Sequence, residues 1–279
     1  MSARDKFGRP IVVVTGMGIV TSLGAGKSDN WSKLVAGESG IRTITRFPID
    51  GLKTTMAGTV DFVPVAPFTS TGLSERLGHM AVEEAIAQAG IGSKGDFPGP
   101  LFLAVAPVEI EWPQRLELAH EVGGTGFSYD DLLKACGGGK FVNYHHRFLF
   151  GSVADSLSDT FGTKGSPISL STACASGATA IQLGVEAIRR GETDVALCAA
   201  TEGSVNPEGL VRFSLLSALS TQNDPPQAAS KPFSKNRDGF VMAEGAGALV
   251  LDELDLDPMA VALFGDSRKS SAWSPAAAN

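Results

Sequence analysis

The fold is decided by the stretch ISLSTACASGATAIQLGVEAIRR, which occupies residues 168–190. Its first four residues, Ile168 to Ser171, suit a buried β-strand, and apolar residues then recur with helical spacing from Ala180 to Ile188. Between these two segments stand the small residues of TACASG, residues 172–177. The pattern therefore predicts a strand, a tight turn and a helix that meet at Cys174.

This predicted position gives Cys174 a chemical role. The first backbone N–H groups of a helix have no partner within the helix, and the helix dipole favours negative charge there. A thiolate, which is the nucleophilic form of cysteine, would be stabilised at such a place. The small residues Ala175, Ser176 and Gly177 leave room for an acyl group to approach. The spacing alone also fits an inert core cysteine, because free cysteines are usually buried.

Composition limits the class of protein. With 279 residues, 43% of them hydrophobic, the chain can bury a large core as one large or two ordinary domains. The net charge of -7 argues against nucleic acid or an anionic membrane surface as the main partner. Cys136, Cys174 and Cys198 have no paired spacing, so neither a disulfide framework nor a metal site is expected, and no cofactor. Without an apolar leader or a membrane span in the sequence, we expect a cytoplasmic protein.

Strands are predicted to alternate with helices along the chain. Apolar runs predict further strands at 11–15, 101–106, 195–200 and 248–251, which favours an α/β fold with a largely parallel, covered sheet. The run GMGIVTSLGAG, residues 16–26, predicts a glycine-rich loop and lacks the GxGxxG spacing of nucleotide sites. Residues 37–62 form a predicted polar excursion, either a hairpin or a surface loop. We expect one domain over 1–254, and a divergent, disordered tail over 255–279.

Four motifs, in order along the chain, resemble one family. They are VVVTGMGIVTSLG at 12–24, AGESGIRTITRF at 36–47, STACASGATAIQLGVEAIRRGETDVAL at 171–197 and ALSTQNDPPQAASKPFSKNRDGFVMAEGAGALVLDE at 218–253. The family is the β-ketoacyl-acyl carrier protein synthases of the elongating type, within the condensing-enzyme superfamily. The resemblance covers the chain from Ile11 to about Leu254 and implies a thiolase-like fold.

The resemblance implies a role for Cys174. This residue would take an acyl chain from acyl carrier protein as a thioester, with its own backbone N–H as one oxyanion donor. Malonyl-acyl carrier protein would then lose CO2, and its carbanion would attack the thioester to give a 3-oxoacyl product, as in fatty acid elongation. The family also implies a homodimer with Ile168 to Ser171 near the interface. A polyketide ketosynthase stays open, as does a non-catalytic chain-length partner subunit, although such subunits typically lack the nucleophile.

The sequence departs from the family in its histidines. The family completes its site with two histidines and a lysine from the C-terminal half of the fold. Here His79, His120, His145 and His146 all precede Cys174. We therefore expect the N-terminal portion of a synthase with most of the second half missing, which can load an acyl group but cannot condense alone.

Two further departures concern the acyl pocket and the surface that binds the carrier protein. The family's glycine-rich segment near the base of the acyl pocket is replaced by PVEIEWP, residues 107–113, so Val108 and Ile110 become candidates for the acyl-pocket wall. The changed wall predicts an atypical acyl chain, unusually long in our hypothesis. Ser217 stands where related synthases often have an arginine that meets the acidic carrier protein, so other basic residues would have to bind the carrier, with Arg76, Arg212 and Lys231 as candidates.

Overall fold

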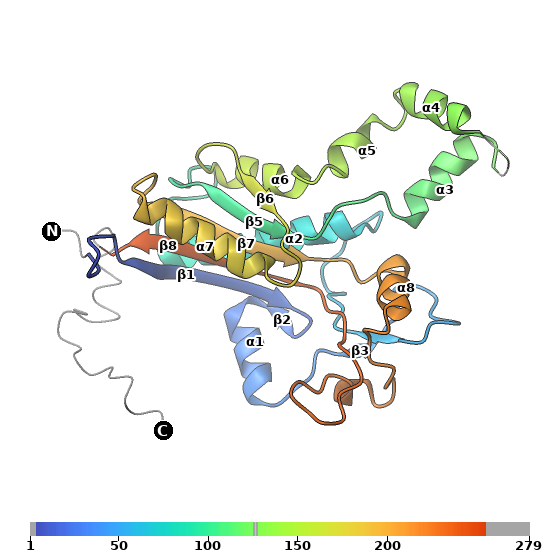
Figure 1. Ribbon diagram of the computed structural model, residues 1–279, viewed down its shortest axis with the longest axis horizontal. Coiled ribbons are helices and arrows are strands. Elements are labelled where there is room, and N and C mark those ends of the chain that lie inside the picture. The colour runs from blue at the N-terminus through green and yellow to red at the C-terminus, as the bar shows by residue number, and fades with distance from the viewer. Residues whose placement is uncertain (1–3, 125, 127, 255–279) are drawn as a thin grey trace.

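A six-stranded sheet, in the order β2-β1-β8-β7-β5-β6, carries helices on both of its faces (Figure 1). The computed structural model describes residues 4–124, 126 and 128–254. The strands of this sheet are β1 (Val12–Thr21), β2 (Gly24–Ala25), β5 (Leu101–Val105), β6 (Ile168–Leu170), β7 (Val195–Glu202) and β8 (Gly245–Glu253). Two short strands, β3 (Arg42–Thr43) and β4 (Met56–Ala57), form a separate ladder. The helices are α1 (Gly26–Val35), α2 (Ser70–Ala89), α3 (Trp112–Glu121), α4 (Tyr129–Gly137), α5 (Val142–Arg147), α6 (Ser152–Phe161), α7 (Ser176–Arg189) and α8 (Pro207–Leu215).

Strand directions confirm the α/β prediction. Strand β5 pairs in parallel with both β6 and β7, whereas β8 lies antiparallel between β7 and β1. Strands β1, β5, β6 and β7 therefore run in one direction, and β2 and β8 run against them. Because parallel strands end at the same edge of a sheet, the segments that follow β5, β6 and β7 leave from one edge. In open α/β sheets this edge is where ligands bind.

Strand β1 is longer than the sequence predicted. It continues through Gly16 and Gly18 to Thr21, where a glycine-rich loop was expected, so that expectation was wrong. A Cβ on Gly16 would lie 2.1 Å from the Ala85 carbonyl oxygen, and a Cβ on Gly18 would lie 1.8 Å from that of Ala81. These glycines let the buried helix α2 lie directly on β1. Their role is close packing between a helix and a strand, not a turn.

The two faces of the sheet are covered to different extents. Helix α2 packs across β1, β8 and β7 on one face, whereas α7 lies over β5 and β7 on the other (Figure 1). Beside α7, the parts of β1 and β8 on this face have no helix in the described chain, and the Met17 side chain is 46% exposed. The sheet therefore presents an apolar strip.

Helices α3, α4 and α5 form an arm, residues 112–147, that extends away from the sheet (Figure 1). Neither α4 nor α5 buries a residue, and α3 buries only Gln114 and Leu118. Helix α4 begins with a capping box between Ser128 and Asp131. Because burial of apolar surface is the main source of stability, the arm depends on its attachments at the base.

The predicted polar excursion at 37–62 is tied to the body of the protein. Ile44 and Ala57 are buried in a small core cluster with side chains from the region between β7 and β8. Arg46 reaches Glu244, its Nη1 lying 2.6 Å from Oε1 and its Nη2 lying 2.9 Å from Oε2. The Glu244 side chain is fully buried. The excursion is therefore part of the packed structure. The predicted tail at 255–279 lies outside the described residues.

Candidate functional site

Cys174 lies on an exposed turn at the edge where the parallel strands end. This turn, residues 171–176, follows β6 and leads into α7. Helix α7 begins at Ser176 with Ala175 as its N-cap, so Cys174 precedes the helix rather than opening it. The preceding residue, Ala173, has φ +53, a left-handed conformation that residues other than glycine seldom adopt. Backbone strain of this kind is concentrated at functional sites.

Two hydroxyl groups hold the turn in this conformation. Ser176 Oγ accepts a hydrogen bond from the Thr172 N–H at 2.8 Å and donates one to the Ala173 carbonyl at 2.6 Å. Thr172 Oγ1 and Thr179 Oγ1 lie 2.9 Å apart. These contacts fix the backbone on both sides of Cys174. Neither Ser176 nor Thr179 was predicted to have this role. Their spacing of four and seven residues from Thr172 was the available signal.

Strand β6 is an edge strand and is not fully buried, contrary to the prediction for Ile168 to Ser171. Its only strand partner in the described chain is β5, and Ile168 is 46% exposed. A short apolar run fits a buried strand and a half-exposed edge strand equally well. The nucleophile candidate therefore follows the most accessible strand of the parallel set.

The three cysteines differ in their surroundings. Cys198 lies in β7 and is 2% exposed, and burial raises the pKa of its thiol to about 12. That thiol stays protonated at neutral pH and acts as a core side chain. Cys136 is exposed on α4, far along the arm. Cys174 is the exposed thiol at the carboxyl edge of the sheet.

Val108 and Ile110 lie in the segment that joins β5 to the arm. Both side chains are half-buried. The parallel register pairs Ala104 of β5 with Leu170 of β6, so this segment and the Cys174 turn leave the sheet side by side. The structure thus brings both residues to the same edge of the sheet as Cys174.

The histidines lie elsewhere. His79 is on α2, with Nε2 3.3 Å from Ser156 Oγ and its ring 5.5 Å from that of Phe161, and burial lowers the pKa of this imidazole. The other three histidines are on the arm, one on α3 and two on α5. None belongs to the Cys174 turn or to a strand.

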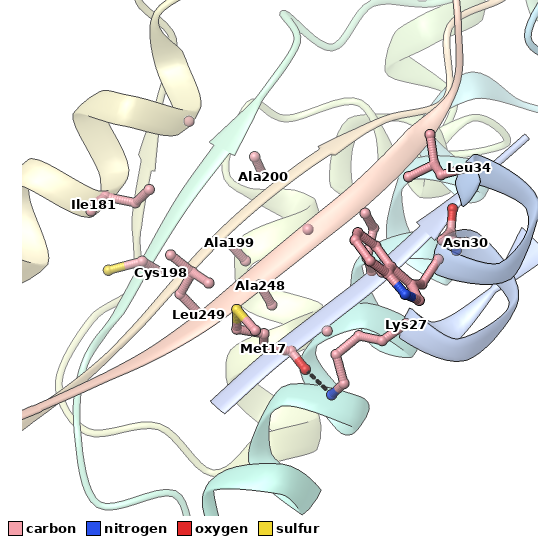
Figure 2. Close-up of a pocket in the computed structure, with 15 residues that line it drawn as sticks. Met17, Lys27, Asn30, Leu34, Ile181, Cys198, Ala199, Ala200, Ala248 and Leu249 are labelled. Carbon is pink, nitrogen blue, oxygen red and sulfur yellow. Dashed lines mark hydrogen bonds between the residues drawn. The ribbon is translucent and has the colours of Figure 1, made fainter. Parts of the chain in front are cut away.

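An apolar groove of about 570 Å³ lies over the uncovered strip of the sheet. Helix α7 forms one wall with Ile181, helix α1 forms the other with Trp31 and Leu34, and Met17 and Leu249 lie on the floor between them (Figure 2). Trp31 is 69% exposed and Leu34 is 58% exposed. The floor residues come from three neighbouring strands, β1, β7 and β8.

The described part of the chain contains neither a membrane-spanning helix nor a metal-binding group of side chains. Over residues 4–124, 126 and 128–254, no helix has the length and apolar character needed to cross a membrane. In the same residues, no group of three or more histidine, cysteine, aspartate or glutamate side chains is placed to hold a metal ion.

Known proteins resemble this chain in sequence and in fold. A family model described as the N-terminal domain of β-ketoacyl synthases matches residues 9–256. The 3-oxoacyl-[acyl-carrier-protein] synthase 2 of Coxiella burnetii is 33% identical over 255 residues, which cover 88% of this chain and 58% of that protein. The tetracenomycin ketoacyl synthase alpha subunit of Streptomyces glaucescens is 32% identical, covering 87% and 58% respectively. In a solved complex of a type II polyketide acyl-carrier protein with its hexaketide-bound ketosynthase, the matching chain has 30% identity and a TM-score of 0.72, covering 88% and 59%. The chain thus spans about three-fifths of the length of these relatives.

Proposed function

Because this chain belongs to the β-ketoacyl synthase family, we propose that it carries the acyl-loading site of an enzyme that condenses a Cys174-bound acyl chain with malonyl-acyl carrier protein. The Cys174 thiolate would attack the carbonyl of an acyl thioester, and the carrier thiol would leave with a proton. The product of this first step is an acyl group joined to Cys174 Sγ. Malonyl-acyl carrier protein would then lose CO2, and its carbanion would displace Sγ to give 3-oxoacyl-acyl carrier protein.

One observation carries this proposal: the exposed Cys174 thiol on a strained turn at the carboxyl edge of the sheet. Backbone N–H groups around the start of α7 are suited to stabilise the oxyanion that forms during acyl transfer, and the Cys174 N–H is our candidate donor. Covalent capture divides the condensation into two easier steps. Both steps are proposed by analogy with the family's elongating enzymes. This chain spans about three-fifths of the length of the matched relatives.

The acyl substrate has two candidates. Fatty acid elongation is our first proposal, and the Coxiella burnetii relative supports it. Polyketide extension is the second, supported by the Streptomyces relative at nearly the same identity. Competition between saturated acyl and poly-β-keto acyl donors for Cys174 distinguishes them. Preferential loading of saturated chains supports the first candidate, and preferential loading of poly-β-keto chains supports the second. Retention of Cys174 argues against a non-catalytic chain-length subunit.

The test of the proposed function separates loading from condensation. The purified chain is incubated with acyl-acyl carrier protein, and intact-mass and peptide mass spectrometry are expected to find one acyl group on Cys174. Adding malonyl-acyl carrier protein is expected to give neither CO2 nor a 3-oxoacyl product, because the family takes its two histidines from the C-terminal half of the fold, whereas all four histidines of this chain precede Cys174. Failure of loading would contradict the proposed role of Cys174. Condensation by this chain alone would contradict the proposed need for a second portion.

The apolar groove supports the proposal that a second portion of polypeptide completes the enzyme. About two-fifths of the length of these relatives lies outside the part that this chain matches, and the strip of β1 and β8 beside α7 is uncovered in the described structure. We expect Ile181→Glu to weaken association with a separately expressed C-terminal portion of a related synthase by tenfold or more, since a charge would be buried in the groove, at about 1.4 kcal/mol per tenfold. Ala87→Glu, on the exposed side of α2, is the matched control. Pull-down titration measures both, and equal affinities would count against the groove as the contact surface.

Association with other copies and with a carrier is also proposed. The free edge of β6 and the exposed Ile168 support a homodimer, which sedimentation equilibrium would reveal or refute.

Acyl carrier protein is the proposed substrate partner. Arg212 is a poor candidate for carrier binding because it already pairs with Glu109, at 2.9 Å from Nη2 to Oε2. The three free cysteines support a reducing, cytoplasmic setting, which cell fractionation would test.

A further inference from the structure

Three helices begin at one junction beside the base of the arm. Glu111 is the N-cap of α3, and its carboxyl accepts a hydrogen bond at 2.6 Å from the N–H of Ser70, the first residue of α2. Glu208, in the first turn of α8, accepts one at 2.6 Å from the Trp112 N–H that opens α3. Asn206, the N-cap of α8, donates from Nδ2 to Ser70 Oγ at 2.9 Å. Each helix start is thus bonded to a residue of another.

Glu111 is the buried member of this junction. The residue is 6% exposed, and burial, aided by the charge of Glu208, raises the pKa of its carboxyl. Burying a carboxyl group is costly unless it is hydrogen-bonded. The unpaired N–H groups at the start of α2 supply those bonds. Because α2 is the helix packed against β1, β7 and β8, Glu111 attaches the arm to the central sheet through this helix.

Both ends of the arm return to the first turn of α2. Glu111, immediately before the arm, meets Ser70, and Arg147, its last residue, packs on Gly72 so closely that a Cβ there would lie 2.5 Å from Arg147 Nη2. Between these ends, α4 and α5 bury nothing. The direction of the arm is therefore set at its base, within one helical turn.

The segment that carries Val108 and Ile110 is held by the same junction. It leaves β5 at Val105 and is fixed six residues later at Glu111, with Glu109 bound to Arg212 of α8 in between. The segment and the Cys174 turn leave neighbouring parallel strands at one edge. A change in the position of Glu111 would therefore move two half-buried side chains, Val108 and Ile110, at the sheet edge that also carries the acyl-accepting thiol.

We propose that Glu111 is a positioning residue for acyl loading: by joining the first turn of α2 to the start of the arm, its side chain sets the place of Val108 and Ile110 and thus the acyl chain length that Cys174 accepts. This proposal rests on the proposed function of Cys174. Glu111 acts through the segment and does not touch the reacting atoms.

The test compares three substitutions. Glu111→Gln keeps an acceptor of the same length for the Ser70 N–H, Glu111→Asp is one methylene too short, and Glu111→Ala removes the acceptor. Hydrogen exchange of α3, residues 112–121, is expected to speed up tenfold or more in the alanine and aspartate variants but by less than threefold in the glutamine variant. Exchange of α7 should change in none of them. The ratio of long-chain to short-chain acyl loading on Cys174, measured by mass spectrometry with acyl thioesters of six to sixteen carbons, is expected to shift by threefold or more in the same two variants.

Glu121→Ala is the matched control, because it breaks an ion pair with Lys140 inside the arm and leaves the junction intact. It should change neither the exchange of α3 at its base nor the acyl selectivity. The proposal is overturned if Glu111→Ala leaves the acyl selectivity at the parent value, whether or not the exchange of α3 changes, or if Glu111→Gln behaves like Glu111→Ala. If the parent chain itself takes no acyl group, the proposed function fails, and the exchange of α3 still decides whether Glu111 fixes the arm.

Discussion

Replacing Cys174 with alanine is expected to abolish the proposed acyl transfer from acyl carrier protein to this chain, reducing the acylated mass species to the background of uncatalysed thiol exchange. The expectation follows from the exposure of the thiol and from the turn that presents it, with Ala173 at φ +53 and Ser176 bonded to both sides. Alanine fits this turn without strain, so folding should be unchanged. Intact-mass spectrometry after a fixed incubation measures the loss, and circular dichroism checks the fold.

Control substitutions at the other thiols make the result specific. Cys136→Ser should load acyl groups at the parent rate, because Cys136 lies on α4 of the arm. Cys198→Ala should also retain loading, since burial keeps that thiol protonated. Cys174→Ser should load far more slowly, roughly a hundredfold or more, because a serine hydroxyl without an adjacent base is a much weaker nucleophile than a thiol. Acylation of Cys174→Ala at the parent level, mapped to another residue, would reject the assignment.

The local pattern of apolar and small residues was sufficient to predict the buried strands and the position of the Cys174 thiol. The apolar runs at 101–106, 195–200 and 248–251 became strands β5, β7 and β8, because continuous apolar stretches of this length suit a sheet covered by helices. The motif around Cys174 predicted its place between a strand and a helix. The sequence placed the meeting of turn and helix at Cys174, whereas α7 begins two residues later, at Ser176, with Ala175 as its N-cap.

Contacts between distant segments explain what the sequence could not predict. Gly16 and Gly18 look like loop residues until α2, more than sixty residues later, is placed on them. The pairing of Glu111 with Ser70 joins residues 41 positions apart, and neither has a local signature. Nothing periodic in the arm indicates its direction. These features are decided by tertiary packing, which overrides local propensity.

The excursion at 37–62, predicted as a hairpin or a surface loop, is the clearest case, because an ion pair across 198 residues ties it to the body of the protein. The Arg46 guanidinium makes a two-pronged contact with Glu244, also bonds Asp61 at 2.9 Å, and lies 4.4 Å from the ring centre of Phe68. Glu244 in turn accepts from the Val60 N–H at 2.8 Å. The Val205 N–H donates to Oε1 at 3.3 Å as well, so each oxygen of the carboxyl accepts two hydrogen bonds.

Arg46→Ala is accordingly expected to lower the free energy of unfolding by about 3–5 kcal/mol, because it leaves the Glu244 carboxyl buried without its charged partner. Arg46→Lys should lose less, about 1–3 kcal/mol, since an ammonium keeps the charge but cannot reproduce both prongs and the bond to Asp61. Urea unfolding followed by fluorescence measures these changes. Arg9→Ala, which breaks an exposed pair with Asp5, is the control and should leave the midpoint unchanged. A loss for Arg46→Ala no larger than for Arg9→Ala would mean that the excursion is held by its apolar cluster and not by this ion pair.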